Sequence, residues 1–563
     1  MKKLLAMLLA VALVVGAVGC SGTTNDSSKA QDSSKTQESS QAQESSQADA
    51  SQEESKEEEV TGFTYPVAPN PDGSLVSISM NKDAFVREDL PAYTIIDGKS
   101  YYYADALEEA TGIHMEWIGS GSSPQSTTEA TNLLIVGGTY PDVWRVNWIT
   151  HPGGPNGALN DGLILNLTEN KESCPNLFAY YEARPDVEKL VVNDDGDMYC
   201  FPYMIETDAE GTSGLGAGFR TDWLAELNME LPRTVDQWTA ALEGFKSMGK
   251  GGLAFEARWL WLENSAANLS NAFDTVYGFY IRDGKVQYGV LDEGYKQFVQ
   301  LLADWYANGL LDADFATVDK STVKAKWANS EVGAVLLHSG DIENGIIANN
   351  GENFECDTVP PMVMNEGDEA QFGHFNAKFN GGFMHSVAPG ENQEIAMRWC
   401  DYLYSDAGRK LTSFGTEGIT WIADENGDLK EFTDLVMNND TTTDSPSTIL
   451  YQFGWKTNWG YPQMPEVRDR FNTDFVNKAS EDFGNTNMSA HYYPTVTHTT
   501  EEADVIANTY SDIETFVKEG IMKFILGTTP MDQWDSFVDS IKSQGIDEVL
   551  AAKQAAYDRF MSR

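Results

Sequence analysis

The sequence predicts an α/β protein with two globular units, and three observations carry this prediction. Its 563 residues exceed what a single hydrophobic core usually organises. From Leu75 onward, short apolar strands alternate with amphipathic helices, a pattern typical of mostly parallel sheets covered by helices on both faces. At Asp195 to Tyr203, a tight acidic turn leads into a short apolar strand, and the helix pattern changes after it. We expect this strand to be the first connection between the units and residues 371–379 to be the second.

The first 20 residues have the pattern of a signal peptide. The basic pair Lys2-Lys3 precedes an apolar run from Leu4 to Val18, which is too short to span a bilayer comfortably. Its end, Ala17-Val18-Gly19-Cys20, resembles the bacterial lipobox, although that pattern prefers Leu where this chain has Ala17. The resemblance implies that Cys20 carries a lipid anchor on the extracytoplasmic face of the cell membrane. The alternative is an ordinary secretory signal with an incidental cysteine.

Residues 21–60 predict a disordered linker. They consist mainly of Ser, Gln, Glu, Asp, Lys, Thr and Ala and contain no aromatic residue, so they have almost nothing to bury. A flexible chain of about forty residues has an end-to-end distance of roughly 35 Å. The folded body would therefore be held near the membrane without touching it.

The formal net charge of −48 argues against two classes of partner. A field of this sign repels nucleic-acid phosphates and an anionic lipid surface, so we expect neither as the main partner. A small anionic ligand held by a local arginine stays compatible with the charge.

The cysteines beyond Cys20 are widely spaced and form no CxxC pair, which argues against a zinc cluster or a redox motif. We expect buried free thiols, with one or two disulfides as the alternative in an exported protein. These cysteines are Cys174, Cys200, Cys356 and Cys400.

Strand and helix signals follow one another through the body. Residues 75–80 alternate as a strand does, 101–111 predict a helix that Gly112 ends, and 113–117 continue as a strand. Residues 127–136 predict the next helix, and the turn at Pro141-Asp142 enters a strand. Further helices are predicted at 235–246, 294–309, 393–404, 499–524, 530–544 and 547–561, and further strands at 330–337 and 381–387.

Two of these helices begin with a capping box, formed by Thr234 with Gln237 and by Thr499 with Glu502. The aromatic residues of 294–309 share one helical face, so we expect them in the core rather than in a binding site.

Several segments resemble the bacterial extracellular solute-binding proteins of the maltose-binding, oligosaccharide-importer type. They are EEATGI, LLIVGGTYPDVW and DGDMYCFPY, followed by FGTEGITW, which is similar to a Gly-x-Glu-Gly-x-x-Trp signature of the longer members. The resemblance extends from Thr61 to Arg563. It implies a two-lobed periplasmic-binding-protein type II fold, with lobe 1 at 61–203 plus about 371–430 and lobe 2 at about 204–370 plus 431–563. It also implies a monomer that binds a carbohydrate, an oligosaccharide by our reading, and delivers it to the permease subunits of an ABC importer.

A sugar site needs flat aromatic faces for stacking and planar polar groups that bind hydroxyls in pairs. The sequence offers such residues outside regular helix faces, and the resemblance favours Trp144, Tyr203 and Trp421 among them. The candidate ligand contacts are Trp144, Arg145, Asn147, Trp148, Tyr203, Trp259, Trp261, Trp421, Trp455 and Trp459. Arg145 and Arg258 could also bind an acidic sugar such as a uronate, although solvated surface positions are the commoner fate of arginines.

Motifs of the common enzyme classes are missing from the sequence. There is no HExxH, no Gly-x-Ser-x-Gly and no GxxxxGKS, so nothing supports a metalloprotease, a hydrolase elbow or a nucleotide site. The acidic stretches at 193–197 and 424–428 lack the full pattern of a calcium loop, and we expect hairpin turns without metal. We therefore expect a binding protein without cofactor. An extracellular polysaccharide-degrading enzyme, or the same fold used for a peptide, another solute or sensing, are the alternatives.

Overall fold

The structure is a computed structural model that describes residues 64–563 except 83–89, 120–123, 152, 206–213, 262–265, 350, 376–378, 443–445 and 455–459. The predicted signal peptide with Cys20, the predicted linker, and Trp455 and Trp459 lie outside the described residues. Within the described ranges, no helix is both long and apolar enough to cross a bilayer.

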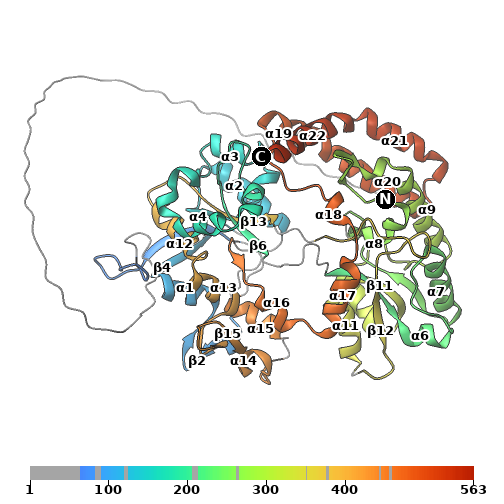
Figure 1. Ribbon diagram of the computed structural model, residues 1–563, viewed down its shortest axis with the longest axis horizontal. Coiled ribbons are helices and arrows are strands. Elements are labelled where there is room, and N and C mark those ends of the chain that lie inside the picture. Colours follow the sequence, from blue (N-terminus) through green and yellow to red (C-terminus); the bar gives the residue numbers. More distant parts are fainter. Residues whose placement is uncertain are drawn as a thin grey trace, which may run out of the picture. The chain divides into compact units, whose positions relative to one another are not determined.

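A six-stranded sheet forms the first half of the fold, in the order β16-β6-β13-β5-β1-β4 (Figure 1). Parallel pairing joins β1 to β4 and β5, whereas β13 runs antiparallel between β5 and β6. The strands are β1 (Val76–Asn81), β4 (Ile113–Ile118), β5 (Val143–Trp144), β6 (Phe201–Ile205), β13 (Phe379–Val387) and β16 (Pro462–Gln463).

Helices bury apolar faces against this sheet and form one hydrophobic core, while the hairpin β14 (Trp421–Ala423) and β15 (Leu429–Phe432) packs with residues of four helices in an adjoining cluster. We call this whole part the six-stranded body. Its helices are α1 (Tyr103–Thr111), α2 (Pro124–Gly137), α3 (Gly154–Asn160), α4 (Pro175–Glu182), α5 (Pro185–Val191), α12 (Gln393–Tyr402), α13 (Asp406–Phe414), α14 (Asp434–Met437), α15 (Pro446–Phe453) and α16 (Glu466–Phe471).

A four-stranded sheet, in the order β12-β7-β11-β8, organises a second core, and we call this part the four-stranded body. Its strands are β7 (Leu215–Arg220), β8 (Gly251–Ala254), β11 (Val332–His338) and β12 (Cys356–Val359), and the hairpin β9 (Phe279–Arg282) and β10 (Lys285–Tyr288) packs beside them. Its helices are α6 (Thr221–Glu226), α7 (Val235–Ser247), α8 (Ala267–Ser270), α9 (Glu293–Ala307), α10 (Lys320–Ala328), α11 (Ser339–Ala348), α17 (Asp474–Gly484) and α18 (Met488–His491).

The C-terminal helices add to the four-stranded core through apolar side chains such as Val517, Trp534 and Val549. They are α19 (Thr500–Val505), a π-helical turn (Ile506–Tyr510), α20 (Ser511–Ile525), α21 (Trp534–Ser543) and α22 (Ile546–Ser562).

Several local predictions are confirmed. Both capping boxes form, at Thr234 and at Thr499. The four described cysteines are free and buried. The acidic stretch before β6 is a turn in which Asn193 accepts the backbone N–H groups of Asp195 and Asp197, and residues 424–428 close the β14–β15 hairpin. The start of one helix differs from the prediction. The predicted helix 530–544 begins only at Trp534, as α21, and Pro530 has an extended backbone before a 3-10 turn.

The chain passes between the two sheets three times. It leaves the six-stranded sheet after β6, returns at β13, and leaves again between β16 and α17. The sequence predicts residues 431–563 in lobe 2, whereas β16 pairs with β6, and α14, α15 and α16 belong to the six-stranded body. A two-residue strand carries no periodicity that a sequence pattern could detect.

Candidate functional site

The parallel strands of the six-stranded sheet end at one edge, where the segment after β5 is held in place. The Asn81 amide donates to the Arg145 carbonyl at 3.1 Å, and its oxygen accepts the Arg145 N–H at 2.6 Å. Asn147 accepts the Ile149 N–H at 3.1 Å and so caps the short turn that follows. Ligands of α/β proteins bind at this kind of edge, and Arg145 and Asn147 are both partly exposed there.

Trp144 and Trp148 lie in the core at this edge. Both side chains are fully buried, with their rings edge to face at 5.9 Å, and the Trp144 indole donates to the Leu163 carbonyl at 2.9 Å. Neither ring offers a face for stacking on a sugar, because neighbouring side chains cover both.

Tyr203 and Trp421 are buried as well. The Tyr203 hydroxyl donates to the Gln463 amide oxygen at 3.1 Å and thereby joins β6 to β16. The Trp421 indole donates to the Gly415 carbonyl at 3.0 Å and packs on Phe414. Their roles in this structure are to fix a strand and the Gly-rich signature loop, so their assignment as ligand contacts stays a prediction.

In the four-stranded body, the segment after β8 contains the predicted ligand contacts Trp259 and Trp261, together with Arg258 and Glu256. Glu256 and Arg258 form an ion pair at 2.8 Å, and the Arg258 side chain is half exposed. Trp259 is buried edge to face against His338, at the end of β11, with ring centroids 5.5 Å apart. Trp261 is partly exposed and packs at the margin of the core.

A pocket of about 590 Å³, which we call the Trp261 pocket, opens beside this segment. It lies between residues 256–261, residues 316–318 and the C-terminal part of α20. Apolar groups form its floor, and the charged side chains of Arg258, Lys518 and Lys523 are part of its lining. The Lys518 ammonium lies 6.0 Å from the centre of the Trp261 ring. Every lining residue belongs to the four-stranded body or the helices that complete its core.

Two buried polar atoms adjoin the pocket without a hydrogen-bond partner among the residues that the structure describes. They are Oε2 of Glu256 and Nε1 of Trp259. Buried polar groups without a partner are costly and uncommon in native proteins. They mark this segment as one in which the described residues leave buried hydrogen-bonding groups unused.

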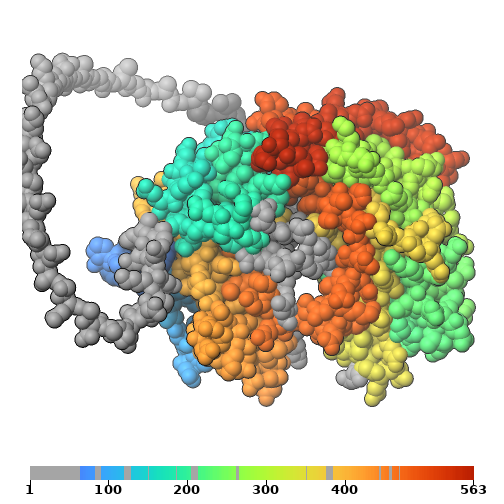
Figure 2. Space-filling model, in the orientation of Figure 1, coloured from blue at the N-terminus to red at the C-terminus, as the bar shows by residue number. Residues whose placement is uncertain are grey.

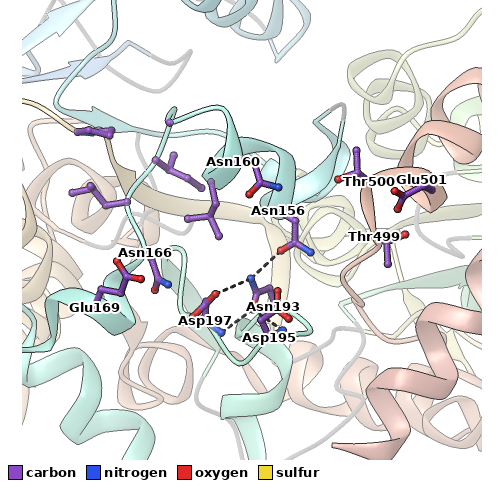
Figure 3. A pocket seen from close by; sticks show the side chains of 15 residues that line it. Asn156, Asn160, Asn166, Glu169, Asn193, Asp195, Asp197, Thr499, Thr500 and Glu501 are labelled. Atoms are coloured by element: carbon purple, nitrogen blue, oxygen red, sulfur yellow. Dashed lines mark hydrogen bonds between the residues drawn. The ribbon is translucent and has the colours of Figure 1, made fainter.

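A second pocket of about 570 Å³, which we call the Asn193 pocket, lies at the other edge of the six-stranded sheet (Figure 3). Leu165, which lines it, donates its N–H to the carbonyl of Val387, the residue that pairs with the start of β5. The described lining contains asparagines, threonines and four carboxylates but no aromatic or cationic side chain, so it lacks a stacking face. Sequence reasoning missed this pocket because its walls come from α3, the turn at 193–197 and the start of α19, which are far apart in the chain.

No metal centre accompanies these pockets in the described part of the chain. No group of three or more His, Cys, Asp or Glu side chains there has the proximity that a metal ion requires. In the turn at 193–197, asparagine and backbone groups satisfy one another.

Comparison with known proteins gives the fold a family. Residues 102–436 match the model of the bacterial extracellular solute-binding protein family. The fructooligosaccharide ABC transporter substrate-binding protein FusA of Streptococcus pneumoniae serotype 4 (strain ATCC BAA-334 / TIGR4) is 23% identical over 489 residues, which cover 81% of this chain and 86% of that protein.

Solved structures share the fold at low sequence identity. Alginate-binding protein AlgQ2 without calcium ion superposes with a TM-score of 0.70 at 20% identity, covering 86% of this chain and 98% of that one. S. pneumoniae FusA in complex with kestose gives 0.70 at 20% identity, covering 86% and 99%. A solute-binding protein from Bifidobacterium longum infantis, described as HMO-binding and associated with an ABC transporter, gives 0.67 at 18% identity, covering 86% and 99%.

These likenesses confirm the predicted α/β fold of the periplasmic-binding-protein type. The family model covers more than half of the chain, and the chain belongs to the bacterial extracellular solute-binding protein family.

Proposed function

We propose that this protein is an extracellular substrate-binding protein that captures an oligosaccharide and delivers it to an ABC-type permease, without catalysing a reaction itself. The names of its relatives, which include a fructooligosaccharide transporter component and a kestose complex, support the ligand class. The observation that carries the proposal is the Trp261 pocket, which lies beyond the carboxyl end of β8.

The pocket has the chemistry that a sugar ring needs. The Trp261 ring and the apolar floor suit the weakly apolar face of a sugar, and the rim supplies charged groups that bind hydroxyls strongly. We propose that Trp261 and Arg258 contact the ligand and that Arg145 and Asn147 meet it from the six-stranded body. Trp455 and Trp459 remain candidate contacts from the sequence.

Enclosure of the ligand would require the two bodies to approach each other by a hinge motion at the chain passages. We assign residues 64–205 and 379–471 to lobe 1. Lobe 2 takes residues 214–375 together with 474–563.

Attachment to the cell follows from the N-terminal segment. We propose that Cys20 carries the lipid anchor and that residues 21–60 tether the monomeric binding protein near the permease. Metabolic labelling with a palmitate analogue tests this, because replacement of Cys20 by serine should abolish the label and release the protein into the medium.

Replacing Trp261 by alanine should weaken oligosaccharide binding about 10- to 100-fold, because stacking on an aromatic face contributes roughly 1–3 kcal/mol. Isothermal titration with kestose, nystose and a panel of other neutral and acidic oligosaccharides measures the change. Phe516→Ala is the matched control, since Phe516 is a partly exposed aromatic residue on the same helix, α20, that does not line the pocket.

Three outcomes would contradict the proposal. Equal affinities of the Trp261→Ala, Phe516→Ala and unchanged proteins would exclude the pocket as the site. Binding of a peptide with no response to any oligosaccharide would overturn the ligand class. Release of shorter sugars during incubation, abolished by one Asp or Glu substitution, would instead indicate a polysaccharide-degrading enzyme.

A further inference from the structure

The C-terminal end of α22 is clamped to the turn that precedes β6. Arg559 donates to Asp194 at 2.7 Å and forms a bidentate pair with Glu502 at the start of α19. Arg563 pairs with the other Asp194 oxygen and donates to the carbonyls of Val192 and Asn193, each at 3.0 Å. The Asp194 and Glu502 side chains are each 15% exposed and the Arg559 side chain is 33% exposed, so these pairs are partly desolvated and high salt can still weaken them from the arginine side.

This clamp joins the two bodies, because α22 is anchored in both. Ile546 and Val549 near its start belong to the core of the four-stranded body, and Gln554 accepts the Val286 N–H of β10 at 2.8 Å. Its last turns pack Phe560 against Leu190, whose helix α5 belongs to the six-stranded body. In Figure 2 the red surface of the C-terminal helices meets the teal surface of residues near 150–200.

The junction is held by charge more than by close packing. Its apolar cluster contains only three fully packed side chains among the described residues, those of Val496, Ala556 and Phe560. Beside the clamp, the Asn193 pocket lies between the turn at 193–197, α3 and the start of α19, and α3 also contacts α19 directly (Figure 3). A junction that contains a polar pocket and depends on a few ion pairs can separate without exposing a large apolar area.

In the arrangement that the clamp holds, the described lining of the proposed ligand site comes from one body. It consists of residues of 256–261, 316–318 and 518–526, which lie in the four-stranded body or its C-terminal helices, and no described residue of the six-stranded body lines the Trp261 pocket. A ligand that contacts both bodies must therefore select a different arrangement, and the clamp opposes that change.

We propose that Asp194, Glu502, Arg559 and Arg563 form an ionic latch that holds the binding protein open and must release or yield when the ligand draws the two bodies together. This inference rests on the proposed function for the role of closure, but the latch itself can be tested without any ligand. Weakening the latch should populate closed arrangements before a ligand is present and should raise the affinity for a ligand that binds the closed form.

Asp194→Asn is the sharpest variant, because it removes the charge and keeps the shape but retains only one of the two oxygens that accept from Arg559 and Arg563. Spin labels at Glu182→Cys on α4 and Asn344→Cys on α11 report the distance between the bodies by pulsed electron resonance in the full-length chain carrying Cys20→Ser. Both labelled positions are exposed, and the four described cysteines are buried. Without ligand, Asp194→Asn should add a shorter-distance population that the unchanged protein lacks, and 1 M salt should shift the unchanged protein the same way.

Asp312→Asn is the matched control. The Asp312–Lys326 pair, at 2.7 Å, is similarly buried but lies wholly within the four-stranded body, so its loss should leave the distance unchanged. Arg563→Gln provides a second latch variant, because Arg563 also pairs with Asp194 across the two bodies, and thermal unfolding of each variant shows whether it folds. With kestose as the probe, latch variants should bind roughly three- to tenfold more tightly than the unchanged protein.

Identical distance distributions for the unchanged protein, both latch variants and the high-salt sample would overturn the latch. Weaker kestose binding by folded latch variants would also overturn it, since the clamp would then favour the bound form. Absence of kestose binding in every sample would count against that ligand and the proposed function, whereas the ligand-free distances would still decide the latch.

Discussion

Replacing Arg220 by methionine should lower the free energy of unfolding of the four-stranded body by about 3–5 kcal/mol, the range for breaking a buried ion pair from one side. The Arg220 side chain is 1% exposed at the end of β7. It donates twice to Asp222, at 2.9 and 2.6 Å, and also to Ser330 and to the Asn353 carbonyl. Methionine would fill the space of the stem but remove the two guanidinium donors of the Asp222 carboxylate and the guanidinium donor of the Asn353 carbonyl.

The guanidinium of Arg220 also lies between two aromatic rings. Its centre is 4.2 Å from the Trp223 ring and 4.0 Å from the Phe354 ring. Desolvated cation–π contacts of this kind add stability to that of the ion pair. The planar guanidinium fits between the two rings, whereas the ammonium of a lysine does not. Arg220→Lys should therefore recover only part of the loss.

Arg282→Met is the control for this prediction. Arg282 also pairs with an aspartate, Asp274 at 2.9 Å, and lies near aromatic rings, but its side chain is 35% exposed. An exposed pair contributes about 0–1 kcal/mol. Urea unfolding followed by circular dichroism and tryptophan fluorescence measures both variants. Equal losses for Arg220→Met and Arg282→Met would show that burial does not decide the contribution of this pair.

Local sequence patterns were enough to predict most of the fold. The capping boxes at Thr234 and Thr499 depend on four consecutive residues, and the inner face of α9 depends on helical spacing, so both are visible in the sequence. The third chain passage was not visible, because β16 is two residues long and its pairing with β6 depends on contacts such as that of Tyr203 with Gln463, 260 positions away.

Candidate site residues are harder to separate from core residues by sequence, for a physical reason. Tryptophan has a large apolar surface and one hydrogen-bond donor, so the same residue suits a core and a sugar site. Trp144 satisfies its donor with a buried carbonyl and is core, whereas Trp261 borders a pocket. Loop position alone does not separate these two outcomes. The latch and the Asn193 pocket were missed because Asp194 and Arg559 are 365 positions apart.

Three histidines should make the folded protein sensitive to mild acid. Burial, together with the Arg145 guanidinium, lowers the pKa of His385 to about 3. Burial lowers the pKa of His374 to about 4, with a smaller contribution from His338. Burial, with Lys553 nearby, also lowers the pKa of His498 to about 4. In each case the folded state favours the neutral imidazole.

Asp401 acts in the opposite direction. Burial raises the pKa of its carboxyl to about 6, against the effect of the Leu177 and Asn176 groups that donate to it. The folded state therefore binds a proton on Asp401 before the unfolded state does, and a fall in pH through 6 stabilises the fold through this residue by about 1 kcal/mol at pH 5.

Lowering the pH from 7 to 5 should decrease the free energy of unfolding by on the order of 5 kcal/mol through these four groups. At pH 7 the histidines are neutral in both states. Below about pH 6.5 the histidines of the unfolded chain bind protons, whereas those of the folded chain bind them only near pH 3–4. This difference lowers the free energy of unfolding by about 2 kcal/mol for each histidine at pH 5, and the sum exceeds the stabilisation from Asp401. Urea unfolding at pH 7, 6 and 5 measures this slope. His374→Gln should flatten it by about two fifths, because glutamine does not titrate. A slope that is flat or identical in the variant would show that these imidazoles are protonated in the folded protein as readily as in the unfolded chain.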